Sequence, residues 1–526
     1  MINTLQARRQ ILGSAIVLIA SSASFASVGA TAAIPPDGCR AAPAGTAAEW
    51  VERARRAVGA PRDSSGAGIR FTATQVTSWN YQSDRQYRPY LAGFDRVEVR
   101  YAPAIRAEVV DGPQYEDVVS GPTRRIIAAP ERTYLVNADS GGALAPPGPG
   151  QHAIAQHARE LNPWAVLDDW QHSADAHLVG RCFYRDAWRV VLARRGPQGE
   201  ERLFLADDNA FPVKRESIEP HYLWGQVHVE DVYTTWLGIE GGGYYPLASF
   251  RLLDGEETVA RTLGLRPDGS PAAARITADD HGALVALPDS GVPMPYVLPA
   301  FLQPRPPDTL RVAPNLYLLT NIGYREAVTR VGDTVVVLEA TQGEERARQD
   351  SVWIGALFPG RHPVMVIVTD VAWPHIAGVR FWAASGATIV THANSVGFLR
   401  RVLARRWTLA PDRYERRRTE QTPRIRAIVT ATRLGDGLDI IPIDGVASEG
   451  ALMVYARPQR FLWASDYVQD ASQPTLYASE VRRAACRAGI VPSLVAAQHL
   501  PLTRWGVVDS LQAADGPCLR PGASPQ

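Results

Sequence analysis

The sequence predicts an α+β protein of two domains, a curved and mostly antiparallel β-sheet followed by a part in which strands and helices alternate. Three observations lead to this prediction. The 526 residues exceed what one hydrophobic core usually organises. Short β-rich segments separated by turn residues fill the first half, whereas from Leu310 onward continuous apolar runs alternate with helical segments. Between the two halves, residues 288–308 are rich in proline, which is typical of a linker.

The chain begins with the pattern of an export signal. Arg8 and Arg9 precede an apolar run from Ile11 to Ala20, and small residues follow up to Ala33. The paired arginines are also compatible with a twin-arginine signal. No later segment has about 18 uninterrupted apolar residues, the length that a membrane span requires. We therefore expect residues 1–33 to be removed, and the mature protein to be periplasmic or secreted without a transmembrane segment.

The overall charge excludes some classes of partner. The net charge is +1, with 46% hydrophobic and 21% charged residues. No overall field attracts nucleic acid or an anionic membrane, so the partner must be inferred from a site. We expect a small-molecule or apolar ligand. The oligomeric state stays open.

Four cysteines remain after the signal: Cys39, Cys182, Cys486 and Cys518. An exported protein can form disulfides, and four cysteines allow three pairings. Cys486 and Cys518 flank the last elements of the chain, so a bridge between these two is the first expectation. No two cysteines have the short spacing of a zinc site, so a metal role is not expected.

Residues 34–287 are expected to form the sheet domain. Residues 47–59 read as a helix, because Trp50, Val51, Ala54 and Val58 recur at helical spacing and Gly59 stops the pattern. A second helix is expected between His152 and Trp170. The expected strands are Ile69–Val76, Val97–Tyr101, Tyr134–Val136, Trp188–Ala193, Arg202–Leu205 and Gln226–Tyr233.

Residues 309–526 are expected to form the second domain. Thr334–Leu338 and Val364–Val368 are buried apolar strands, and Thr341–Leu357, His375–Ser385 and Ser395–Ala404 fit helices. The order of these segments, with Gly386–His392, Glu449–Tyr455, Arg460–Asp466 and Gln498–Trp505, resembles the metallo-β-lactamase fold. The resemblance implies an αββα sandwich, with an acidic residue at Glu339. Residues 34–287 resemble, by pattern alone, the curved-sheet lipoprotein-carrier-like domains.

The family's metal-binding motif, His-x-His-x-Asp-His, is largely lost. Asp370, Ala372 and Pro374 stand at its first three ligand positions, and only His375 is retained. Ala447 stands where the family has a further histidine. Asp466 matches the bridging aspartate of the family and His499 its last histidine.

The resemblance implies that the loss is uneven. The first metal site keeps at most carboxylates, which hold zinc poorly against water. The second keeps His375, Asp466 and His499, a ligand set able to bind one zinc or iron ion with open positions. Asp370 is then either a fourth ligand or a general base.

Three interpretations follow. The site is dead, and the protein is a ligand-binding or scaffold pseudoenzyme. Alternatively, one metal ion held by His375, Asp466 and His499 hydrolyses an ester, lactone or amide. In the third, the same pocket catalyses without metal, with Asp370 or Asp466 as the base.

Other candidates are better explained by structure. His392 follows a strand and is expected to be a structural histidine. The basic run from Arg413 to Arg418, with Arg400, Arg401, Arg405 and Arg406, is expected to be a solvated helix and loop rather than an anion-binding lip. The aromatic residues Trp79, Tyr81, Tyr87, Tyr90, Tyr222 and Trp224 fit either an apolar ligand cavity or ordinary sheet packing.

Overall fold

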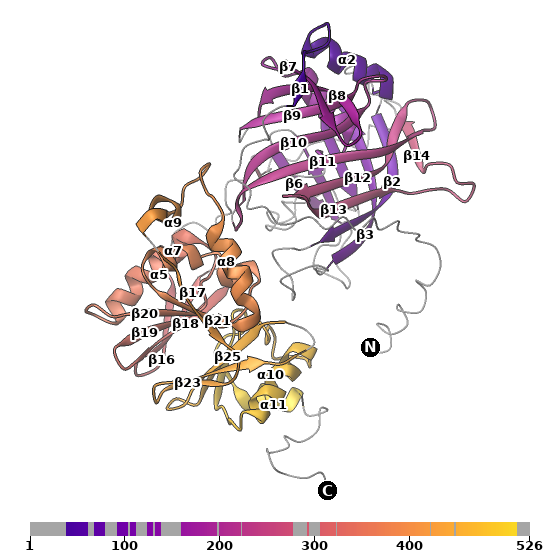
Figure 1. Cartoon of the computed structure of the whole chain (residues 1–526). Coiled ribbons are helices and arrows are strands. Elements are labelled where there is room, and N and C mark those ends of the chain that lie inside the picture. The colour runs from indigo at the N-terminus through magenta and orange to yellow at the C-terminus, as the bar shows by residue number, and fades with distance from the viewer. Residues whose placement is uncertain are drawn as a thin grey trace. The chain divides into compact units, whose positions relative to one another are not determined.

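The protein is seen here in a computed structural model (Figure 1). It describes residues 38–60, 68–78, 92–103, 106–111, 124–129, 132–137, 159–196, 199–221, 223–276, 292–293, 306–321, 323–420, 422–445 and 449–512. The expected signal, residues 1–33, and most of residues 288–308 lie outside these ranges. No helix within them is long and apolar enough to cross a membrane.

One large sheet occupies the first half of the described chain. It has fifteen strands in the order β1-β7-β8-β9-β10-β11-β12-β13-β2-β3-β4-β5-β6-β15, with β14 pairing beside β2. All of its pairings are antiparallel, as the sequence predicts. The strands are β1 (Cys39–Arg40), β2 (Gly68–Ser78), β3 (Ala92–Ala102), β4 (Ala107–Asp111), β5 (Arg124–Ala128), β6 (Arg132–Asn137), β7 (His177–Tyr184), β8 (Ala187–Arg195), β9 (Glu200–Ala206), β10 (Pro212–His221), β11 (Gly225–Gly238), β12 (Tyr244–Leu253), β13 (Glu256–Leu263), β14 (Ala273–Ile276) and β15 (Val292–Pro293).

Two helices pack on one face of this sheet, α2 (Ala47–Val58) and α4 (Pro163–Gln171). Helix α2 begins at a capping box, in which the Thr46 hydroxyl accepts a hydrogen bond from the backbone N–H of Glu49 and the Glu49 carboxylate accepts one from that of Thr46. It ends at Gly59 in the left-handed conformation, as predicted. The shared core contains Trp50 and Val51 from α2, Trp164, Leu167 and Trp170 from α4, and Phe71 and Tyr245 from the sheet.

The turn between β11 and β12 lies against α2. The three glycines of this turn, Gly241, Gly242 and Gly243, all have positive φ, and Gly243 has a φ of 99°. A Cβ atom at Gly243 would lie 2.9 Å from the carbonyl oxygen of Val58, whereas one at Gly242 would meet nothing within 4 Å. Only a glycine therefore allows this close approach of the turn to the helix end.

A buried ionic cluster lies on β9, β10, β11 and β12. Asp231 accepts hydrogen bonds from Arg215 Nη1 at 2.9 Å and Arg251 Nη1 at 3.1 Å. Arg215 Nη2 also lies 3.0 Å from carboxylate oxygens of both Glu160 and Glu201, and Arg251 Nη2 lies 3.6 Å from Glu219. Glu201 is also bonded to Arg194 at 2.8 Å, so the cluster contains four carboxylates and three guanidinium groups.

The second half of the described chain contains two sheets. The first has seven strands in sequence order, antiparallel from β16 to β19 and parallel from β19 to β22. They are β16 (Asp308–Ala313), β17 (Leu316–Asn321), β18 (Tyr324–Val331), β19 (Thr334–Leu338), β20 (Val364–Val368), β21 (Thr388–His392) and β22 (Arg424–Ile428). The helices among them are α5 (Glu344–Leu357), α6 (Trp373–Ile376), α7 (Val379–Ala384), α8 (Val396–Ala404) and α9 (Arg413–Arg416), with short 3₁₀ helices at Ala393–Ser395 and Arg418–Glu420.

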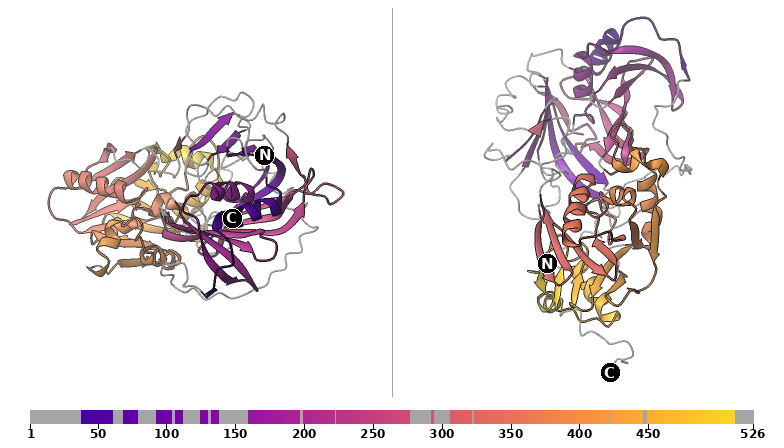
Figure 2. Two further views of the ribbon diagram at one scale, coloured as in Figure 1. Left: turned by 90° about the horizontal axis from the view of Figure 1, so that it is seen from above. Right: turned by 90° about the vertical axis from the view of Figure 1, so that its left-hand side faces the viewer.

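The other sheet has six strands, also in sequence order, and only β26 and β27 are parallel among them. They are β23 (Thr432–Leu434), β24 (Leu438–Ile443), β25 (Ala451–Ala456), β26 (Phe461–Trp463), β27 (Leu494–Ala496) and β28 (Thr503–Arg504). The accompanying helices are α10 (Leu476–Arg487) and α11 (Trp505–Leu511). The two sheets are the salmon-to-yellow strands of Figure 2.

Three apolar clusters hold these layers together. One lies between the sheets and combines Leu318, Val336 and Val390 of the first with Leu452 and Trp463 of the second. Another joins the seven-stranded sheet to α5, α7 and α8, and the third joins the six-stranded sheet to α10 and α11. Each sheet therefore buries both of its faces, as its continuous apolar runs predict.

Some elements differ from the prediction. Strand β18 was not predicted, because its buried Glu326 interrupts the apolar pattern. The helix expected over His375–Ser385 is two helices, α6 and α7. Val292 and Pro293, expected in the linker, pair with β6 of the large sheet. The helix expected from His152 appears in the described residues only as α4, beginning at Pro163.

The disulfides are partly described. Cys39 is bonded to Cys182, a pair that the sequence did not single out. Cys486 also belongs to a disulfide. Its expected partner, Cys518, lies outside the described residues.

Candidate functional site

Polar residues from four strand ends meet at one place. Glu339 follows β19, Asp370 follows β20, and Asp466 and His499 come shortly after β26 and β27. Strands β19 and β20 are parallel, as are β26 and β27, so each pair directs its carboxyl end to one edge. Residues at the carboxyl ends of parallel strands commonly form binding sites. Helix α6 adds His375 to this group.

Glu339 anchors the group in the core. Its side chain is fully buried. The carboxylate accepts hydrogen bonds from the Thr369 hydroxyl and, at 2.9 Å, from Trp463 Nε1, which belongs to the other sheet. The backbone of Glu339 has a φ of 96°, a conformation that costs free energy in a residue other than glycine. Such strain is tolerated where surrounding contacts fix a side chain in place.

His375 lies between two carboxylates. Its Nδ1 is 3.1 Å from Oε2 of Glu339, and its Nε2 is 3.9 Å from Oδ2 of Asp466. Burial alone would lower the pKa of this imidazole, but the negative charge of Glu339 and the contact with Asp466 hold it well above its usual value. In the described arrangement His375 therefore favours the protonated form.

Asp466 and His499 lead from the core to the surface. His499 Nε2 lies 3.7 Å from Oδ1 of Asp466, whose Oδ2 accepts a hydrogen bond from Gln469 at 3.0 Å. The exposed fraction of the side chain rises from 0% at His375 to 18% at Asp466 and 35% at His499. The His499 ring packs edge-on against Tyr324. Burial lowers the pKa of His499, and the charge of Asp466 opposes this effect.

Asp370 lies near this group, but is held differently. Its Oδ1 accepts a hydrogen bond from the backbone N–H of Ala372 at 2.8 Å, which closes the loop before α6. Burial raises its pKa, while the charge of His375 opposes this. Among the described residues, it makes no hydrogen bond or ion pair with His375, Asp466 or His499.

The three expected metal ligands can be tested by geometry. Two imidazoles and a carboxylate suit zinc, whose tetrahedral ligand atoms lie roughly 3.3 Å apart. The distances from Asp466 to His375 Nε2, 3.9 Å, and to His499 Nε2, 3.7 Å, are longer than this. In the described part of the chain, only Glu216, His228 and Glu230 bring three ligand atoms within 4.8 Å of one another. As placed, His375, Asp466 and His499 therefore do not fit a metal ion.

The Glu216 group is itself occupied by a side chain. Lys214 Nζ lies 2.5 Å from Glu216 and 2.7 Å from Glu230, and it lies over the rings of Tyr184 and Phe204. The ammonium group thus already supplies the positive charge that the two carboxylates require.

The remaining predicted positions are of two kinds. His392 lies outside the group, and its Nδ1 accepts a hydrogen bond from the backbone N–H of Asn394 at 3.2 Å, a structural contact. Ala447, Trp79, Tyr81, Tyr87, Tyr90 and Tyr222 lie outside the described residues.

Sequence reasoning missed the residues that hold the group together. Glu339 was expected only as an acidic position, and Thr369 and Trp463 were not singled out. The Trp463 contact joins residues 124 positions apart, so no local pattern reveals it.

Comparisons with known proteins find only distant structural similarity. The sequence matches no model of a protein family and no curated protein. Several solved structures of metallo-β-lactamases are similar over about two fifths of the chain. The enzyme from Pontibacter korlensis is 14% identical, with a TM-score of 0.31, and covers 39% of this chain and 97% of its own. The enzyme from Erythrobacter litoralis is 14% identical, with a TM-score of 0.30, and covers 39% and 93%. FIM-1 from Pseudomonas aeruginosa, in the mono-zinc form, is 11% identical, with a TM-score of 0.31, and covers 40% and 94%.

Proposed function

We propose that the second half of the chain is a divergent hydrolase domain that cleaves an ester, lactone or amide. The proposal rests on the contact series Glu339–His375–Asp466–His499. In it, the buried imidazole of His375 is held by the carboxylate of Glu339 and also contacts the carboxylate of Asp466, which lies nearer the surface. Burying the ionisable groups of Glu339 and His375 is costly unless they are paired, and clusters of this kind are frequent at functional sites.

The chain's own residues suffice for a hydrolytic step. A carboxylate, Asp466 or Asp370, removes a proton from a water molecule, and the hydroxide oxygen attacks the carbonyl carbon of the substrate. The tetrahedral intermediate then collapses, and the proton passes to the leaving oxygen or nitrogen. His375, fixed by Glu339, orients Asp466 through its Nε2. His499 lies at the solvent side, where it is placed to exchange the proton.

A single zinc or iron ion is the alternative within the same proposal. It would need the ligand atoms of His375, Asp466 and His499 to move closer together than the 3.9 Å and 3.7 Å at which they lie. Metal content of the purified mature protein after refolding with zinc decides this point. Less than about a tenth of an equivalent excludes the metal, whereas binding that is lost in both His375→Ala and His499→Ala, and kept in His392→Ala, establishes it.

Activity is tested with a panel of esters, lactones and amides. We expect Asp466→Asn to reduce kcat/KM by a factor of about 100 or more, as the removal of a general base does, and His392→Ala to leave it unchanged. Circular dichroism of each variant verifies folding. Hydrolysis that survives Asp466→Asn, Asp370→Asn and His499→Ala together would contradict the proposal.

One observation favours a second candidate, a pseudoenzyme that binds a ligand or serves as a scaffold. The three expected ligand atoms do not converge among the described residues. This candidate predicts neither metal binding nor hydrolysis of any compound in the panel.

The surrounding organisation is also proposed. The layers around the two smaller sheets support an αββα sandwich over residues 309–526, separated by residues 288–308 from a curved-sheet domain over residues 34–287. The Cys39–Cys182 disulfide supports export to the periplasm or the medium, since disulfides persist in oxidising compartments. We propose a small-molecule or apolar ligand as the partner, and no nucleic acid.

A further inference from the structure

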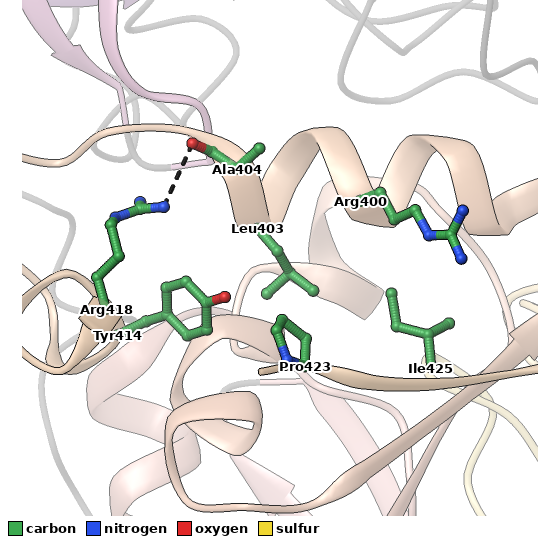
Figure 3. A pocket seen from close by; sticks show the side chains of 7 residues that line it. All are labelled: Arg400, Leu403, Ala404, Tyr414, Arg418, Pro423 and Ile425. Atoms are coloured by element: carbon green, nitrogen blue, oxygen red, sulfur yellow. Dashed lines mark hydrogen bonds between the residues drawn. The ribbon is translucent and has the colours of Figure 1, made fainter. Parts of the chain in front are cut away.

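A pocket separate from the Glu339–His375 group opens between α8, α9 and the beginning of β22 (Figure 3). Its volume is about 330 Å³, at the lower end of the range for small-molecule sites. The residues that line it are Arg400, Leu403, Ala404, Tyr414, Arg418, Pro423 and Ile425. None of them belongs to the proposed reaction centre.

The lining combines an apolar middle with cationic ends. Figure 3 shows Leu403 and Pro423 between Arg418 on one side and Arg400 on the other. Arg418 is fixed, because its Nε and Nη2 donate to Glu415 at 3.0 Å and 2.6 Å. The exposed guanidinium of Arg400 makes no hydrogen bond or ion pair to any residue that the structure describes. The same holds for the hydroxyl group of Tyr414.

The local charge favours an anion at this pocket. From Arg400 to Arg426 the sequence has ten arginines and three acidic residues, a local net charge of +7 in a chain whose total is +1. Many of these arginines are neutralised by contacts, such as Arg416 with Glu344 and Arg406 with Glu415. Arg400 is different, because its charge lies at the pocket without an acidic partner in the described part of the chain.

We propose that this pocket binds a small amphiphile with an oxyanion headgroup, its apolar body against Leu403, Pro423 and Ile425. Arg400 binds the headgroup, since a guanidinium pairs well with either a carboxylate or a phosphate. This site is independent of hydrolysis, and it takes up the anion-binding alternative for the basic run.

Equilibrium dialysis of the full mature protein tests the proposal with octanoate and octyl phosphate as probes. We expect saturable binding of at least one of them, with acetate and 1-octanol binding much more weakly because each lacks one half of the recognised chemistry. The preferred probe shows whether the headgroup is a carboxylate or a phosphate.

Two variants of neighbouring arginines provide the control. Arg400→Gln should weaken binding about tenfold, the loss of one charge-assisted hydrogen bond on a partly exposed side chain. Arg401→Gln removes the same charge from the next residue of α8, which does not line the pocket, and should change affinity less than about twofold. Equal losses in both variants, binding of 1-octanol as tight as that of octanoate, or no saturable binding of either anion would overturn the proposal.

Discussion

The carboxyl group of Asp231 lies in a buried cluster that contains more carboxylate groups than guanidinium groups. Burial, opposed by Arg251 and increased by Glu160, raises the pKa of Asp231 to about 6. Three guanidinium groups, those of Arg194, Arg215 and Arg251, serve four carboxylates there, so a proton on one carboxylate relieves repulsion among the others. The fold accepts this cost because every charge in the cluster has at least one close partner.

This arrangement predicts a pH dependence of stability. The pKa of Asp231 is higher in the folded state than its usual value of 3.8, so the folded state binds the proton more tightly. The resulting stabilisation is complete below about pH 4 and is lost as the pH rises through about 6. Unfolding by urea at pH 5, 6 and 7 should therefore show the wild type gaining stability at pH 5 relative to Asp231→Asn. A difference between the two proteins that is the same at all three pH values would contradict this assignment.

At the scale of elements, local signals account for what the sequence predicted. Helix α2 was predicted correctly because Trp50, Val51, Ala54 and Val58 form one apolar face and Gly59 provides the stop. Strand β18 was missed because one of its buried positions is occupied by an acidic residue, Glu326. Burial and the neighbouring Asp350 raise its pKa well above the usual value, and it accepts a hydrogen bond from Thr341. A buried acid with distant partners looks like a surface residue in the sequence.

The β11–β12 turn offers a matched test of element packing. Gly242→Ala introduces a side chain at positive φ into open space, which costs about 1 kcal/mol. Gly243→Ala has the same backbone penalty, and in addition places Cβ against the carbonyl oxygen of Val58, so we expect a loss of about 2–3 kcal/mol. Denaturant unfolding of both variants measures the difference. Equal losses would show that the turn moves freely away from α2.

At the scale of the whole molecule, the Cys39–Cys182 bridge closes a long loop. The two cysteines are paired across β1 and β7 and are 143 residues apart in the sequence. A crosslink over such a length restricts the unfolded chain strongly. The double variant Cys39→Ser/Cys182→Ser should therefore lose about 2–4 kcal/mol of unfolding free energy, measured by denaturant titration. An unchanged midpoint would mean that the crosslink adds nothing to the stability of the folded protein.

The sequence indicated the residues of the candidate site, but not the contacts between residues that are far apart in the chain. The resemblance pointed to His375, Asp466 and His499, and the structure brings these three together, while their roles stay predictions. It could not give the distances between them, which depend on two sheets meeting through Glu339, Thr369 and Trp463. Asp370, predicted as base or ligand, instead closes a loop through Ala372.

Because the side chain of His375 is buried and that of His499 is partly exposed, chemical labelling of the two histidines can show whether a ligand is bound at the site. Diethyl pyrocarbonate acylates accessible, neutral imidazoles, so His499 should be labelled rapidly and His375 only after unfolding. Mass spectrometry of the digested protein then reads both histidines in one sample. A molecule that binds against His499 must shield it, whatever its chemistry, so loss of labelling offers a way to screen for ligands before any reaction is known.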